Sequence, residues 1–229
     1  DVVVMQREYL LLLPIVGAIL IANSPLRLAV YGKAFMVGLL FGLSAMIKPH
    51  AIIGLPVALA AIWWNDDTPL LTRQLQKIFF GSLFALSGAA IPAAIATGYM
   101  VSQGIFTSFL DAIINYLPLY SGISRTFTII EGPKRASYIA STFIQLNGYR
   151  IWVFAGGISA TLLLYINPQL RRDTLILIGF VSAYAIYPAV SGQFFSYHWL
   201  PFLYFVIILA ASGLNTLLVE NSYRLQILG

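Results

Sequence analysis

The sequence predicts an all-α membrane protein, a polytopic transmembrane helical bundle of about seven spans with an amphipathic interfacial helix in a long external loop. Of its 229 residues, 59% are hydrophobic and 9% are charged, and the mean hydropathy is +0.85. A soluble domain carries about 25% charged residues and about 45–50% apolar ones. This composition excludes a soluble enzyme, a nucleic-acid-binding domain and a disordered chain, because a soluble globule of this size could not bury so much apolar surface.

Seven apolar runs supply the predicted spans, since a membrane-spanning helix needs about 20 residues. The runs cover residues 9–22, 34–47, 51–64, 78–101, 151–166, 175–190 and 199–219. One broken helix over residues 34–64 is the alternative to separate second and third spans. We favour two helices, because Pro49 pushes the preceding residue out of helical geometry and because Lys48 and His50 make the turn polar.

The spans give a three-part organisation. Residues 1–101 hold the first four spans, 102–150 form the external loop, and 151–229 hold the last three. The short connections at 23–33, 65–77 and 167–174 are basic. The positive-inside rule places such loops in the cytoplasm. We therefore expect a multi-pass protein of the bacterial inner membrane, with the remaining connections and the active site facing the periplasm or the exterior.

The first part of the long loop has a helical pattern of apolar side chains. They are Phe106, Phe109, Leu110, Ile113, Ile114 and Leu117. Such a stripe predicts an amphipathic helix lying on the membrane surface, whereas the remainder, 121–149, is polar and contains glycine. Trp63, Trp64, Trp152 and Trp199 fall at span ends. Tryptophan at such positions is typical of interfacial anchors.

The net charge and the absence of several motifs exclude some kinds of partner and chemistry. The net charge of +5 reflects the positive-inside bias and lipid headgroups, so we expect membrane lipids and no nucleic acid as partners. The chain has no Cys and two His, which gives no disulfide, no cysteine nucleophile and no expected metal site. The sequence lacks the GxxxxGK[ST] phosphate loop and the GxGxxG, GxSxG and HExxH motifs, so ATP-driven chemistry is not expected.

Six polar residues at the outer ends of the predicted spans are the candidate substrate-binding residues. They are Arg7, Glu8, Lys48, His50, Tyr197 and His198. Charges near a membrane are costly, so each one is a functional candidate. A lysine ammonium can bind phosphate as a point charge, and a neutral histidine can donate a hydrogen bond or move a proton. The alternatives are a local Arg–Glu pair at a helix end, a snorkelling lysine and a structural histidine.

Two segments carry a resemblance to a known family. A polar QRE at 6–8 opens a span, a basic linker follows, and the string GLLFGLSAMIKPHAIIGLPVALAAIW begins at Gly38. The late string GQFFSYHWLPFLYFVIILAASGL begins at Gly192. In this order they resemble GT-C type glycosyltransferases, the polyprenyl-phosphate-sugar-dependent membrane enzymes that include protein O-mannosyltransferases and bacterial lipid A aminoarabinose transferases.

The resemblance implies transfer of a sugar from a polyprenyl-phosphate-linked donor to an acceptor at the outer face. It implies supporting roles for Lys48, His50 and His198 around the donor phosphate and no further cofactor. The family's catalytic acid lies in the first external loop, which this chain lacks, so we expect a partial chain whose catalytic residue is unknown. A transporter or lipid flippase, or a non-catalytic subunit of polysaccharide assembly, is the alternative; transporters usually show inverted repeats and midplane charges.

Overall fold

The computed structural model describes residues 7–24, 29–64, 71–122, 130–166, 168–191 and 194–227, and every element within them is helical. The first elements are α1 (Arg7–Asn23), α2 (Val30–Ile47), the 3₁₀ helix η1 (Pro49–Gly54), α3 (Leu55–Trp64) and α4 (Leu71–Ser102). Next come α5 (Phe106–Asp111), the π-helical turn η2 (Ala112–Tyr116), α6 (Leu117–Gly122), α7 (Pro133–Gln145) and η3 (Leu146–Gly148). The last are α8 (Arg150–Ile166), η4 (Pro168–Leu170), α9 (Arg171–Ser191), η5 (Ser196–Trp199) and α10 (Leu200–Ile227). The all-α prediction is confirmed for these residues.

The helices differ in their capacity to span a bilayer. Every predicted apolar run is helical, but four helical stretches of the described chain are long and apolar enough to cross a membrane by themselves: Val30–Ile47, Gln74–Ser102, Arg171–Val190 and Ser196–Leu218. A fifth arises if α7 and α8, bent by 64° at their junction, form one span. The fold is thus that of a helical integral membrane protein with four to five candidate spans. The predicted number of seven is not confirmed, because α1 and α8 have 17 residues each and α3 has 10.

The chain breaks between α2 and η1, where a polar turn was predicted. Lys48 is extended, with φ −147° and ψ 119°, and Pro49 is the first residue of η1. Proline disfavours helical geometry in the residue before it, so the prediction of two helices rather than one is confirmed. The turn places Lys48 and His50 at the same end of the bundle.

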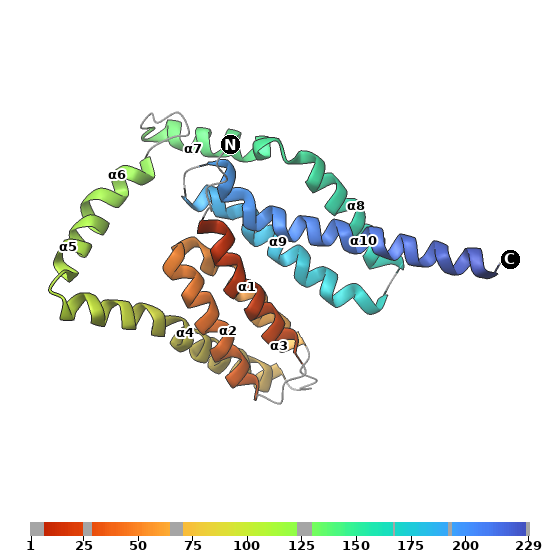
Figure 1. The fold of residues 1–229 in the computed structure, drawn as a ribbon, viewed down its shortest axis with the longest axis horizontal. Coiled ribbons are helices and arrows are strands. Elements are labelled where there is room, and N and C mark those ends of the chain that lie inside the picture. Colours follow the sequence, from red (N-terminus) through yellow and green to blue (C-terminus); the bar gives the residue numbers. More distant parts are fainter. Residues whose placement is uncertain are drawn as a thin grey trace.

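Glycines let α2 and α4 approach each other closely, and Figure 1 shows α4 crossing α2. A Cβ atom at Gly38 would lie 1.9 Å from the carbonyl oxygen of Ala85, and one at Gly42 would lie 2.4 Å from that of Ala89. Small residues four positions apart are a recurrent means of packing membrane helices. The opposite side of α4 exposes large apolar side chains, including those of Phe79, and suits contact with lipid.

Aromatic side chains fill the core between α9 and α10. The rings of Phe180 and Tyr184 on α9 stack on Phe205 of α10, with centroid separations of 4.8 and 5.5 Å. Tyr184 is fully buried and its hydroxyl donates a hydrogen bond of 2.9 Å to the carbonyl oxygen of Ala51. Because Ala51 lies in η1, this bond joins α9 to the turn that follows Lys48.

The long connection between α4 and α8 is mostly helical. The predicted helix forms as α5, η2 and α6, which arch away from the other helices in Figure 1. Side chains of its predicted stripe, such as Ile114, are exposed. The second helix of this connection, α7, lies in the part that the sequence pattern indicated to be polar and for which no helix was predicted. Tyr138, Ile139 and Phe143 on α7 pack against the main core, so this part of the connection contributes to the bundle.

Trp199 differs from the other tryptophans predicted at span ends. Trp64 and Trp152 are 55% and 41% exposed, whereas Trp199 is fully buried. Its ring lies 6.2 Å from that of Phe143 and 6.4 Å from that of Phe194, measured between centroids. The prediction of an interfacial anchor is therefore wrong for Trp199, because α7 covers a position that would otherwise face the membrane edge.

Candidate functional site

A buried carboxylate forms the centre of the candidate site. Glu8, in the first turn of α1, is 1% exposed. Its Oε1 accepts a hydrogen bond from the Lys48 ammonium in an ion pair that joins α1 to the α2–η1 turn. His198 Nε2 of η5 lies 3.9 Å from the same oxygen. A buried charge is tolerated when it is paired, so Lys48 is the group that stabilises Glu8 in the interior.

Lys48 has an environment that differs from that of its partner. Its side chain is 20% exposed, and its ammonium lies 4.8 Å from the centre of the Tyr197 ring, a distance at which a cation is attracted to an aromatic face. Burial lowers the pKa of Lys48 below its usual value, the hydrogen bond and charge of Glu8 oppose that shift, and the charge of Arg7 adds to it. Lys48 can therefore reach solvent while it remains attached to the buried carboxylate.

Two histidines contact one tyrosine. The rings of His50 and His198 both meet Tyr187 of α9 edge to face, at centroid separations of 5.8 and 5.9 Å. His198 also meets Tyr197 edge to face at 4.6 Å. Burial, followed by the charge of Lys48, lowers the pKa of His50 below 6.5. His50 is therefore mainly neutral at pH 7 and can donate a hydrogen bond through one ring nitrogen.

These residues form one polar group, which we call the Glu8 cluster: Glu8, Lys48, His50, Tyr187, Tyr197 and His198. They come from α1, the α2–η1 turn, α9 and η5. The inner members, Glu8, Tyr187 and His198, are buried, whereas Lys48, His50 and Tyr197 are partly exposed. The cluster is accordingly a polar site with a closed inner side and an accessible outer side.

The structure brings together five of the six residues proposed from the sequence: Glu8, Lys48, His50, Tyr197 and His198. Arg7 is exposed and acts on Lys48 through its charge. The partner of Glu8 is Lys48, forty residues away, and not the adjacent Arg7 of the local-pair alternative. Sequence reasoning missed Tyr187. The available signal was its spacing of three residues from Tyr184, which places both tyrosines on one face of the helix.

Basic residues of the predicted external loop, 102–150, are exposed, partly exposed or outside the described residues. Lys134 is exposed at the start of α7. Arg150, also exposed, donates a hydrogen bond of 3.5 Å to the carbonyl oxygen of Ile144. Arg125 lies outside the described residues, as does the neutral Gln6 of the QRE string. Among the basic residues that the structure describes on the predicted outer face, Lys48 is the one that it places in contact with Glu8.

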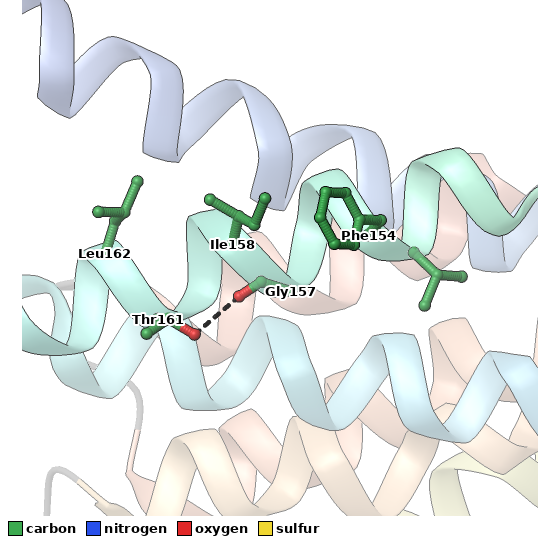
Figure 2. Close-up of a pocket in the computed structure, with 6 residues that line it drawn as sticks. Phe154, Gly157, Ile158, Thr161 and Leu162 are labelled. Atoms are coloured by element: carbon green, nitrogen blue, oxygen red, sulfur yellow. Dashed lines mark hydrogen bonds between the residues drawn. The ribbon is translucent and has the colours of Figure 1, made fainter.

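A shallow groove on α8 is distinct from the Glu8 cluster and is mostly apolar (Figure 2). It is lined by Val153, Phe154, Gly157, Ile158, Thr161 and Leu162. Its hydroxyl group, Thr161 Oγ1, donates a hydrogen bond of 2.9 Å to the carbonyl oxygen of Gly157 in the same helix. With no charged side chain in its lining, this groove suits an apolar chain and not a polar substrate.

No protein-family model, curated protein or solved structure matches this chain. Across the described residues, His, Asp and Glu side chains form no group of three or more that could hold a metal ion. The fold and the site define a helical integral membrane protein with a buried carboxylate–lysine–histidine cluster at one end of its helices. Its function has to be argued from that cluster.

Proposed function

We propose that the chain is a GT-C-like membrane glycosyltransferase, or the C-terminal part of one. It transfers a sugar from a polyprenyl-phosphate-linked donor to an acceptor at the outer face of the membrane. The observation that supports this proposal is the convergence of Glu8, Lys48 and His198 from three separate elements. Together they supply a partly exposed ammonium, a buried carboxylate and one buried imidazole where the ends of apolar helices meet.

The chemistry of sugar transfer accounts for this arrangement. The departing polyprenyl phosphate accumulates negative charge, and a positioned cation stabilises that charge in the transition state. The Lys48 ammonium has three hydrogens, of which Glu8 takes one. Two remain for phosphate oxygens. The neutral His50 adds a further donor on the accessible side. No residue of this chain is assigned as the general base for the acceptor, so the proposal names no catalytic residue.

The distribution of charge supports an outward-facing cluster. Glu8 and Asn23 lie at opposite ends of α1, about 22 Å apart at 1.5 Å of rise per residue. At the Asn23 end, Lys33 Nζ donates to the carbonyl oxygen of Ser24 at 2.6 Å, and Arg172 donates to Asn23 Oδ1 at 2.8 Å. Basic residues therefore gather at the end opposite the cluster. By the positive-inside rule, that end is cytoplasmic.

The full topology is part of this proposal. The seven helical segments each cross the membrane, and the shorter ones, α1, α3 and α8, do so with flanking residues or by local thinning of the bilayer. The cluster then faces the periplasm of a bacterial inner membrane. Single cysteines provide the test, because the chain has none of its own. We expect Ser137→Cys to react with an impermeant maleimide in intact cells and Asn65→Cys to react after permeabilisation. Labelling of Asn65→Cys in intact cells would overturn the topology.

The functional test compares two lysines at opposite ends of α2. Lys48→Arg keeps a cation but replaces the compact ammonium that contacts Glu8 with a planar guanidinium. Lys48→Met removes the charge. Lys33→Met is the matched control, because Lys33 contacts a backbone carbonyl at the other end of the helix. Loss of a charged hydrogen bond is worth about 1.5–3 kcal/mol, so we expect Lys48→Met to reduce use of the polyprenyl-phosphate donor by roughly 10-fold to 100-fold. The assay is sugar transfer by the full-length protein in vesicles.

Turnover of the variants is compared at equal amounts of folded protein, so that a loss of stability is not read as a loss of activity. Lys33→Met should retain wild-type turnover and Lys48→Arg should be intermediate, because arginine is a cation of different shape. Unchanged turnover in both Lys48→Met and His198→Asn would leave the cluster with a structural role and would overturn the proposal.

A proton-coupled transporter is the second candidate, favoured by the buried Glu8 in contact with a lysine and a histidine. Ionisable groups of this kind form proton relays within membrane proteins. The two functions respond differently to a proton gradient. A transferase turns over donor in vesicles without a gradient, whereas a coupled transporter moves its substrate when a gradient is imposed and modifies nothing.

A further inference from the structure

The hydroxyl of Tyr187 stands out among the buried polar groups of the cluster. Tyr187 is fully buried, and its Oη has no hydrogen-bond partner within the part of the chain that the structure describes. Tyr184, one helical turn earlier and equally buried, donates to the carbonyl oxygen of Ala51 at 2.9 Å. Buried polar groups are almost always paired, and an unpaired one calls for a specific explanation.

The surroundings of Tyr187 place this hydroxyl within the cluster. His50 and His198 meet its ring edge to face, at 5.8 and 5.9 Å between centroids. His198 in turn lies 3.9 Å from Glu8 Oε1 through its Nε2 and meets the Tyr197 ring edge to face at 4.6 Å between centroids. Glu8 Oε1, the nearby anionic acceptor, is already engaged by Lys48 and approached by His198. The Tyr187 hydroxyl is thus an unpaired hydrogen-bond donor in the same cluster as the cationic donor Lys48 and the neutral donor His50.

We propose that Tyr187 is a ligand-binding residue whose hydroxyl donates a hydrogen bond to a phosphate oxygen held at Lys48. This inference rests on the proposed function, because the phosphate is that of the polyprenyl-phosphate donor. An ammonium, a neutral imidazole and a phenol hydroxyl together form a set of donors that suits an anionic oxygen. The ligand approaches from the partly exposed side, which Lys48 and Tyr197 line.

Two isosteric substitutions separate ligand binding from structural support. Tyr187→Phe removes an unpaired hydroxyl, and Tyr184→Phe removes a paired one, while both keep the aromatic ring. Before ligand is added, Tyr187→Phe should be as stable as the wild type or more stable, because an unsatisfied buried group is lost. Tyr184→Phe should be less stable, because it leaves the carbonyl of Ala51 without its donor. Stability is measured as the thermal unfolding midpoint of the full chain in lipid nanodiscs.

Binding is then measured with three probes: undecaprenyl phosphate, phosphatidic acid and inorganic phosphate. We expect Tyr187→Phe to weaken binding of undecaprenyl phosphate by about 10-fold to 100-fold, the range for a hydrogen bond to a charged group. Tyr184→Phe should bind with wild-type affinity. Phosphatidic acid and inorganic phosphate show whether recognition is of the polyprenyl phosphate, of any lipid phosphate or of phosphate itself.

The outcomes distinguish this inference from the proposed function. If the wild type binds undecaprenyl phosphate and Tyr187→Phe binds it equally well, the inference is wrong and the proposed function stands. If only inorganic phosphate or phosphatidic acid binds and Tyr187→Phe weakens that binding, the role of Tyr187 stands and the proposed donor is wrong. If Tyr187→Phe lowers the ligand-free unfolding midpoint as much as Tyr184→Phe does, the Tyr187 hydroxyl already has a hydrogen-bond partner such as a structural water. The inference is then overturned. Binding of none of the probes would overturn both.

Discussion

The Glu8–Lys48 ion pair gives the sharpest test of the cluster, because its two members differ in access to water. The Lys48 side chain is 20% exposed and that of Glu8 is 1% exposed. Lys48→Met leaves an interior carboxylate whose nearest described basic group is His198, with Nε2 at 3.9 Å. Glu8→Gln leaves an ammonium that reaches solvent and keeps a neutral oxygen beside it. We therefore predict unequal effects on the free energy of unfolding.

The expected magnitudes follow from the two environments. Removing one partner of a buried ion pair costs about 3–5 kcal/mol when the remaining charge stays buried, and Lys48→Met meets that condition. For Glu8→Gln we expect about 1 kcal/mol, because one charge-assisted hydrogen bond becomes a weaker one. The double variant removes both charges. It should be more stable than Lys48→Met alone by about 2 kcal/mol, because no uncompensated charge remains.

The assay is reversible unfolding of the full chain in mixed micelles by titration with dodecyl sulfate, followed by tryptophan fluorescence. Trp199 is a suitable reporter, because it is fully buried and belongs to η5, the element that carries His198. An equal cost for the two single variants would show that burial does not decide the energetics of the pair. A double variant no more stable than Lys48→Met would show that Glu8 is not the uncompensated charge.

Three further predictions concern positions around this pair. Burial lowers the pKa of His50 below 6.5, so as the pH falls below about 6.5 the unfolded chain takes up a proton that the folded chain does not. The stability of the folded protein should therefore decline in that range. His50→Gln should flatten the profile of unfolding midpoint against pH. Gly38→Ala should lower the free energy of unfolding in the micelle titration by about 1–3 kcal/mol or more, because the added Cβ would meet a backbone oxygen of α4 at 1.9 Å. Gly98→Ala is the control, because its Cβ would have nothing within 4 Å. It should be neutral or stabilising by about 0.5 kcal/mol. Arg172→Lys should cost about 1–2 kcal/mol. The single nitrogen of a lysine cannot reproduce the bonds from Nη2 to Asn23 at 2.8 Å and to an α3 carbonyl at 3.0 Å together with the bond from Nη1 to Asp173 at 2.9 Å. A Tm equal to that of the wild type would contradict this last expectation.

The helices and the break at Lys48 follow from local sequence properties. An apolar run must form a helix in a bilayer because its backbone groups have no water to bond to, and Pro49 constrains the residue before it. The number of spans does not follow in the same way. The lengths of α1, α3 and α8 depend on where each helix ends, and element boundaries are the least certain feature of any sequence pattern.

The composition of the cluster was only partly accessible from sequence. Glu8, Lys48 and His198 could be placed on one face because each is a polar residue that interrupts or borders an apolar run, and the topology counts the crossings between them. The pairing of Glu8 with Lys48 instead of Arg7 is a tertiary result. Tyr187 lies inside an apolar run and has an amphipathic side chain, so its pattern does not differ from that of Tyr184, which serves the core.

The burial of Trp199 and the existence of α7 have a common explanation. The helix α7 mixes apolar residues with polar and basic ones, so its average hydropathy is low and its sequence looked like a polar connection. Its Tyr138 and Phe143 nevertheless pack on the core, where they meet Phe194 and Trp199 edge to face and in a stack, at 6.1 and 6.2 Å. Contacts of this kind join segments more than fifty residues apart. The periodicity of α7 predicts an apolar face, but it does not identify the segment on which that face packs.

Charge balance within the cluster constrains how a phosphate could bind there. Glu8 and Lys48 neutralise each other, so an approaching anion meets no net positive charge from this pair and binds through the two Lys48 hydrogens that Glu8 leaves free. A phosphate at Lys48 adds negative charge beside a carboxylate that is already buried. The other basic side chain beside that carboxylate is His198, whose Nε2 lies 3.9 Å from Glu8 Oε1, so His198 is placed to offset the added charge. Lys48 and Tyr187 therefore hold the ligand, and Glu8 and His198 keep the ammonium in position to do so.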